Sequence, residues 1–215
     1  MLRRNNLFSS YTSIIILINV ITFIAFFFLS NSVGGNSAVS LIALQPAAIL
    51  AGKNIWTFAT SMFMHANFTH IFVNMISLMF IGSFVEKLIG RKRFLWLYLG
   101  SGLFAGIFFV LLAAILGSDL NVYAVGASGA IFGLGGLLAI LTPRLPVLVF
   151  FIIPMPMWLA MIFLFGILYL LSFSLGIPIG NAAHFGGLIV GVAYGLYLKS
   201  KYPGKAKMIR DYFSR

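Results

Sequence analysis

The chain of 215 residues is 61% hydrophobic and only 8% charged, with 14 lysines and arginines against 3 acidic residues and a net charge of +11. Soluble domains are about 45–50% apolar and about 25% charged, so this composition excludes a soluble globular protein. The lack of cysteine excludes disulfide scaffolds, thiolate metal sites and a cysteine nucleophile, and three acids are too few for most paired-carboxylate chemistry.

Apolar runs long enough to cross a bilayer recur along the chain. A bilayer core of about 30 Å requires roughly 20 apolar residues in a helix, because lipid cannot hydrogen-bond to exposed backbone. This criterion predicts six spans, at about 11–30, 63–85, 94–116, 127–141, 157–175 and 181–198. We therefore expect an all-α, multi-pass membrane protein, with one domain over residues 1–215 that ends in a basic tail at 199–215.

Two further apolar segments do not qualify as spans. Residues 31–62 form a long connection that carries Trp56 and Phe58, residue types that favour the membrane–water interface, so we expect a loop half-submerged in the outer leaflet. Residues 147–153 are followed by Pro154 and Pro156, which indicates a bent connection rather than a helix.

The basic residues predict how the chain is oriented. Short loops rich in lysine and arginine stay in the cytoplasm, and six spans place thirteen of the fourteen basic residues on one side. Only Lys53 falls on the other side. The sequence thus predicts cytoplasmic termini in a plasma or inner membrane. Because the basic residues separate apolar runs instead of lining a soluble face, we expect the lipid bilayer as partner and no nucleic acid.

Polar side chains inside the spans gather near one end of the predicted bundle. Such residues are costly in a bilayer, so each is a functional candidate. The second, fourth and sixth spans all run inward, which places five candidates at the outer end: His65, His70, Asn74, Ser128 and His184. Ser128 would lie roughly 8 Å below the outer surface, where water can reach it through a protein-lined cavity.

Glycines at four-residue spacing predict a close contact between the fourth and sixth spans. The sixth carries Gly187, Gly191 and Gly195 at this spacing, and the fourth nearly repeats it with Gly129, Gly133 and Gly136. Small residues at this spacing allow helix backbones to approach closely. The contact would permit Ser128 Oγ to reach a ring nitrogen of His184.

A serine hydroxyl within reach of a histidine ring nitrogen suggests nucleophilic catalysis. His184 would act as the base for Ser128, and none of the three acids is placed to orient the imidazole, so we expect a dyad held by packing against Phe132. His70, Asn74 and the backbone N–H of Ser128 are candidate donors for an oxyanion hole.

Other interpretations of these residues stay open. Ser128 and His184 are also compatible with helix packing, and the three histidines suggest a water-lined transporter path or zinc. The five-residue spacing of His65 and His70 does not stack two metal ligands, and a transporter predicts ionisable groups further along the spans. We therefore expect no metal and no other cofactor.

Three motifs together resemble the rhomboid family of intramembrane serine proteases. Residues 126–133 (GASGAIFG) are similar to the family's G-x-S-G motif, the series His65, His70 and Asn74 to its H-x-x-x-x-H-x-x-x-N motif, and residues 183–187 (AHFGG) to its A-H-x-x-G motif. The motifs occur in the family's order, and the resemblance covers about residues 11–198.

The resemblance implies cleavage of a peptide bond in or near a transmembrane helix of a client protein. It assigns Ser128 as nucleophile and His184 as base, with an oxyanion hole from His70, Asn74 and the Ser128 N–H. It gives supporting roles to His65, Gly126, Gly129, Phe132, Gly187 and Gly191, and a structural role to Glu86. Clients would enter beside the fifth span, under a mobile cap at residues 172–180. The alternative is a rhomboid-like binder of membrane helices that does not cut them.

Two departures from the family pattern concern the site's surroundings. Trp56 is followed by Thr57, where the family often has arginine, so the first outer connection should be anchored differently. Phe132 stands where some members have tyrosine, which keeps an aromatic ring beside His184 and removes a hydroxyl.

Overall fold

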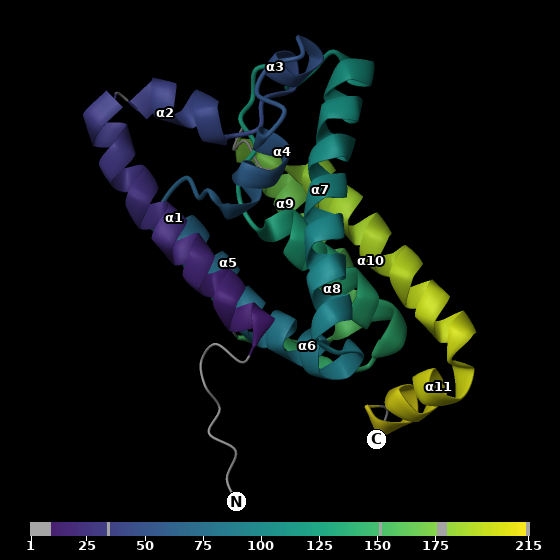
Figure 1. The fold of residues 1–215 in the computed structure, drawn as a ribbon. Coiled ribbons are helices and arrows are strands. Elements are labelled where there is room, and N and C mark those ends of the chain that lie inside the picture. The colour runs from purple at the N-terminus through teal and green to yellow at the C-terminus, as the bar shows by residue number, and fades with distance from the viewer. Residues whose placement is uncertain (1–9, 34, 151, 176–179, 214–215) are drawn as a thin grey trace, which may run out of the picture.

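Long apolar helices dominate the computed structural model, which describes residues 10–33, 35–150, 152–175 and 180–213. Five helical stretches in these ranges are long and apolar enough to cross a membrane. They are α1 (Tyr11–Val33), the continuous run of α5 (Phe68–Ser77), η3 (Leu78–Gly82) and α6 (Ser83–Ile89), α7 (Arg91–Leu116), α9 (Met157–Leu175) and α10 (Asn181–Lys201). The protein is thus a multi-pass helical membrane protein (Figure 1).

The fourth predicted span is a shorter helix, α8 (Ser128–Leu141), with 14 residues. At 1.5 Å per residue it is about 21 Å long, less than the roughly 30 Å of a bilayer core. All residues from 129 to 138 are buried, because α7, α9 and α10 pack around the helix. The predicted six spans therefore become five long helices around one short, central helix.

The second predicted span begins five residues later than hydropathy suggested. Asn67 Oδ1 accepts a hydrogen bond of 2.9 Å from the backbone N–H of His70, and this cap starts the helix at Phe68. His65 precedes the helix instead of lying inside it. The middle of the span, η3, is a π-helical turn. The π-helical turn packs against the start of α1. A Cβ added to its Gly82 would lie 3.1 Å from the side chain of Thr12.

The connection after α1 is largely helical, which corrects the expected loop. It contains α2 (Gly35–Ile42), α3 (Pro46–Leu50), α4 (Thr57–Thr60) and the 3-10 turn η2 (Ser61–Phe63). Side chains tie these short helices to backbone carbonyls: Trp56 Nε1 donates to Leu41 at 2.8 Å, and Thr57 Oγ1 donates to Asn54 at 2.6 Å. The segment is therefore anchored without the family's arginine at position 57.

Two further segments have more regular structure than expected. The bent connection at 147–153 is part of an antiparallel hairpin of β1 (Pro146–Val149) and β2 (Ile153–Pro156), in which Pro146 lies opposite Pro156. The basic tail contains a helix, α11 (Pro203–Tyr212), that turns away from the axis of α10 (Figure 1).

Glycines set the register between α8 and α10. A Cβ at Gly187 would overlap the backbone carbonyl oxygen of Gly129, and a Cβ at Gly191 would overlap that of Gly133. Backbone atoms cannot rotate out of the way as a side chain can, so only glycine fits at these two positions.

Glu86 of α6 joins the start of α1 to the bundle. Its carboxylate accepts hydrogen bonds from the N–H groups of Tyr11 and Thr12, at 2.8 and 2.9 Å, and from the hydroxyls of Ser10 and Thr12, both at 2.7 Å. Arg91 Nε lies 3.5 Å from the same carboxylate. Glu86 thus satisfies two of the free N–H groups at the start of α1 and places negative charge at the positive end of the helix dipole.

We expect Glu86→Ala to lower the free energy of unfolding in detergent by about 2 kcal/mol or more, because four hydrogen bonds to the start of α1 are lost. Glu86→Gln keeps one acceptor oxygen and should lose less. Thermal unfolding of the three proteins in one detergent measures the order. Equal melting temperatures for parent and Glu86→Ala would contradict the capping role.

Candidate active site

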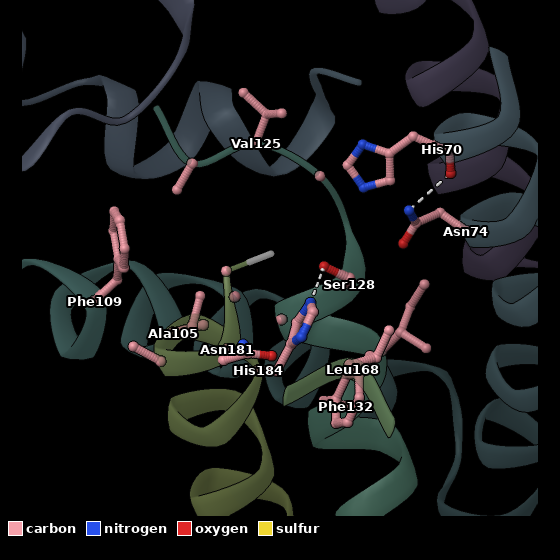
Figure 2. A pocket seen from close by; sticks show the side chains of 18 of the residues that line it. His70, Asn74, Ala105, Phe109, Val125, Ser128, Phe132, Leu168, Asn181 and His184 are labelled. Carbon is pink, nitrogen blue, oxygen red and sulfur yellow. Dashed lines mark hydrogen bonds between the residues drawn. The ribbon is translucent and has the colours of Figure 1, made fainter. Parts of the chain in front are cut away.

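Ser128 and His184 meet at one end of the α8–α10 contact. Ser128 is the first residue of α8, and His184 lies in the first turn of α10. Their side chains are 2.8 Å apart, from Oγ to Nε2, across 56 residues of sequence (Figure 2). The contact of Gly187 with Gly129 lies immediately beyond the pair, so the glycine register fixes this distance.

Packing holds the His184 ring. The ring of Phe132 stacks on it with a centroid distance of 4.5 Å and an interplanar angle of 13°. His184 is 7% exposed, and its Nδ1 has no hydrogen-bond partner among the residues that the structure describes. Among the described residues, stacking on Phe132 therefore orients the His184 ring, a role that an acidic residue has in a catalytic triad.

His70 and Asn74 of α5 face Ser128 from the other side of the cavity (Figure 2). The N–H of Ala66 donates a long hydrogen bond of 3.5 Å to Nδ1 of His70, so a neutral His70 carries its proton on Nε2. Asn74 Nδ2 donates one hydrogen bond to the carbonyl of His70 at 2.9 Å, and an amide nitrogen has a second proton to donate. Two side chains therefore offer donors opposite the serine.

Gly126 brings the segment before α8 close to His70. Its φ is +114°, a conformation that residues with a side chain rarely adopt. A Cβ here would lie 2.8 Å from Nε2 of His70, and the N–H of Gly126 donates to the carbonyl of Ser61 at 2.8 Å. Glycine at position 126 thus leaves room for His70 at the cavity wall.

The other predicted supporting residues lie behind the site. His65 is 1% exposed, and its ring meets that of His70 edge-on, with centroids 5.0 Å apart. Gly187 and Gly191 lie in the helix contact, whereas Gly129 lies both in this contact and at the cavity. The three histidines do not form a ligand set, since no group of three His, Cys, Asp or Glu among the described residues is arranged to hold a metal.

A cavity of about 950 Å³ opens beside Ser128. Its polar part contains Ser128, His184, His70 and Asn74, and its apolar walls come mainly from α7, α8, α9 and the segment 122–125. Asn181, one turn before His184, also lines the cavity and was missed by sequence reasoning. Its three-residue spacing from His184 was the available signal, because that spacing places both side chains on one helix face.

A family model for the Rhomboid domain matches residues 52–201. The chain belongs to the rhomboid family. The matched range begins in the connection after α3 and ends with α10, so it contains every residue of the site. Relatives of this rhomboid-family chain include GluP of Bacillus subtilis, which is named a rhomboid protease.

Named relatives of this rhomboid-family chain come from bacteria, fungi and plants. It is 37% identical over 40% of its length to the putative rhomboid protease YdcA of Bacillus subtilis, and 31% identical over 64% to mitochondrial Rhomboid protein 1 of Saccharomyces cerevisiae. It is 32% identical over 41% to Inactive RHOMBOID-like protein 8 of Arabidopsis thaliana. The matches cover 41%, 40% and 24% of these relatives, so the chain spans less than half of their length.

Proposed function

We propose that the protein is an intramembrane serine protease that cuts a peptide bond in or near a transmembrane helix of its clients. The observation that carries the proposal is the 2.8 Å contact between Ser128 Oγ and His184 Nε2 at a cavity with further hydrogen-bond donors. A serine hydroxyl becomes an effective nucleophile when a histidine removes its proton.

In the first step Ser128 Oγ attacks the carbonyl carbon of the scissile bond while His184 Nε2 takes its proton. Negative charge develops on the carbonyl oxygen, and the N–H of Ser128, Nε2–H of His70 and the free amide proton of Asn74 stabilise it. The tetrahedral intermediate collapses as His184 gives the proton to the leaving amine. Water, deprotonated by the same histidine, then attacks the acyl carbon and restores Ser128.

The apolar walls of the cavity favour a transmembrane helix as substrate. Val73 and Ile81 line it from the second span, and Leu168 and Tyr169 line it from α9. Tyr169 is 55% exposed, so this wall extends to the lipid-facing surface. We propose that clients enter laterally beside α9. Of the predicted cap at 172–180, Gly176 and Pro178 lie outside the described residues.

We further propose one membrane domain over residues 1–215 with cytoplasmic termini, located in a plasma or inner membrane. The start of α1, the α6–α7 corner and α11 share one end of the bundle (Figure 1), and this end carries most of the basic residues in the described ranges. The mitochondrial relative makes a mitochondrial membrane the competing location.

A reconstitution experiment tests the proposed activity. The purified protein is incorporated into liposomes with a tagged single-span client, and the products are identified by mass spectrometry. We expect one main cut, within or next to the client's membrane segment. Equal cleavage with and without a chelator is also expected, because a serine–histidine dyad needs no metal.

The competing function is a rhomboid-like binder that does not cut its clients, which the Arabidopsis relative named as inactive brings into consideration. A binder would retain the client in co-purification from the same liposomes and release no product. The intact contact between Ser128 and His184 favours the protease.

A further inference from the structure

A cluster of cations lies at the end of the bundle opposite the candidate active site. Arg93 of α7, Lys201 of α10 and Lys205 of α11 place their charged groups 5.7, 5.8 and 5.9 Å from the ring centroid of Tyr202. All three side chains are exposed. Three helices therefore bring three positive charges to one aromatic ring.

These charges repel one another, and apart from the rings of Tyr197 and Tyr202 the described residues supply little to offset the repulsion. Within the described ranges, none of the three cations forms an ion pair with a carboxylate. The ion pair seen there joins Arg91 to Glu86. Asp211 lies six residues after Lys205, on a different side of α11. Lys201 donates one hydrogen bond to Tyr197 Oη, at 2.6 Å, and keeps two further protons to donate. An anion at the cluster would relieve the repulsion, and its oxygens would accept charge-assisted hydrogen bonds from these cations.

A mainly aliphatic cavity of about 200 Å³ lies directly beside Arg93 and Lys205, and Lys201 lies next to it across the ring of Tyr202. Arg93, Lys205 and Tyr202 contribute to its lining, and the remainder is mostly aliphatic, from Leu88, Leu141, Leu198 and Ile209 among others. Ligand pockets for drug-sized molecules measure about 300–1,000 Å³, so this cavity fits only part of a larger molecule. A cationic rim over an aliphatic floor suits an amphiphile with an anionic head.

The exposed face of α11 has the character of a helix that lies at a membrane surface. Met208 and Tyr212 are 67% and 75% exposed, and they follow Lys205 at helical spacing on the same side. Apolar side chains beside basic ones are typical of interfacial helices that bind anionic lipids. The position of α11, directly after the membrane-spanning α10, puts this face at the depth of the lipid headgroups.

We propose that Arg93, Lys201 and Lys205 bind the phosphate of an anionic phospholipid, whose glycerol and upper acyl region occupies the neighbouring cavity. Inorganic phosphate shares the anionic chemistry, but it would leave the aliphatic floor and the exposed Met208 and Tyr212 uncovered. The site is separate from the proposed protease chemistry and holds whether or not the protein cuts clients.

Lipid titration of the full chain in detergent tests this site. The melting temperature is measured with added phosphatidylglycerol, phosphatidylcholine or inorganic phosphate. We expect a saturable rise with phosphatidylglycerol alone. The double variant Arg93→Gln/Lys205→Gln should bind phosphatidylglycerol more weakly by a factor on the order of 30, because each basic residue near a lipid headgroup contributes roughly a factor of five.

The matched control is Lys87→Gln/Lys207→Gln, which removes the same charge from the same end of the bundle but leaves the cations around Tyr202 in place. Its affinity should stay within about twofold of the parent's. An equal loss in this control would show general surface charge and overturn the proposal. An equal rise with phosphatidylcholine or with inorganic phosphate would overturn it as well. If the site variant melts early without lipid, Lys205→Gln replaces it, and native mass spectrometry counts the phosphatidylglycerol that each protein retains.

Discussion

Replacing Ser128 with alanine is expected to lower kcat/KM for a single-span client by a factor on the order of 10⁴ or more. The change removes only the Oγ, whose recorded hydrogen bond is the one to His184. His184→Ala should lose a comparable factor, and the double variant should lose little more, since the two groups act as one unit. Initial rates of client cleavage in liposomes measure all three.

Ser200→Ala provides a matched control for this series. Ser200 lies on α10 as His184 does, but it is exposed near the other end of the helix. We expect its rate to equal that of the parent. More than a tenth of the parent rate in Ser128→Ala would contradict the nucleophile assignment. Client retained by Ser128→Ala in co-purification would show that the binding surface survives the substitution.

Gly191→Val is expected to destabilise the protein by about 3 kcal/mol or more, and to lower any cleavage rate by on the order of 100-fold. The new side chain would occupy the position of the Gly133 carbonyl, so α8 and α10 must separate. The separation moves Ser128 away from His184, and misplacement by about 1 Å is costly in catalysis. Thermal unfolding and client cleavage measure the two effects.

Gly166→Val is the matched control for this substitution. Gly166 lies within the apolar helix α9, and a Cβ there meets no atom within 4 Å. Its melting temperature should stay close to the parent's. If Gly191→Val and Gly166→Val behave alike, the glycine contact does not set the register between α8 and α10.

Much of the membrane architecture follows from hydropathy, because a long apolar helix is dictated by the solvent around it. The predicted ranges 94–116 and 157–175 lie close to α7 and α9. The error at the start of the second span has a local cause. Hydropathy continued the span through Met64 and His65, whereas the hydrogen bond from Asn67 to the N–H of His70 begins the helix at Phe68.

Short elements could not be predicted in the same way. The helices α2, α3 and α4 are held by contacts between segments, such as the bridge of Leu44 with Ala124, which no local pattern reveals. The prolines at 154 and 156 correctly argued against a span, but they gave no sign of strand pairing with residues 146–149.

The candidate site was predictable to the extent that its residues are polar and lie in apolar surroundings. Ser128, His184, His70 and Asn74 all meet this condition, and all line the cavity. Asn181 was missed because it is the first residue of α10. Polar residues are common at helix starts, so its presence there did not indicate a functional site. The position of His65, behind His70, depends on the turn before α5 and could not be derived from spacing.

The central position of α8 has a consequence for the biosynthesis of the protein. Ser128 is synthesised well before His184, which belongs to the last of the described helices long enough to span a membrane. While α10 is still within the ribosome and the insertion machinery, α8 lacks the glycine-faced partner that buries it. A nascent chain therefore presents the serine without its histidine. The pair forms only when α10 has entered the bilayer, so neighbouring nascent helices meet no contact of Ser128 with His184 before that moment.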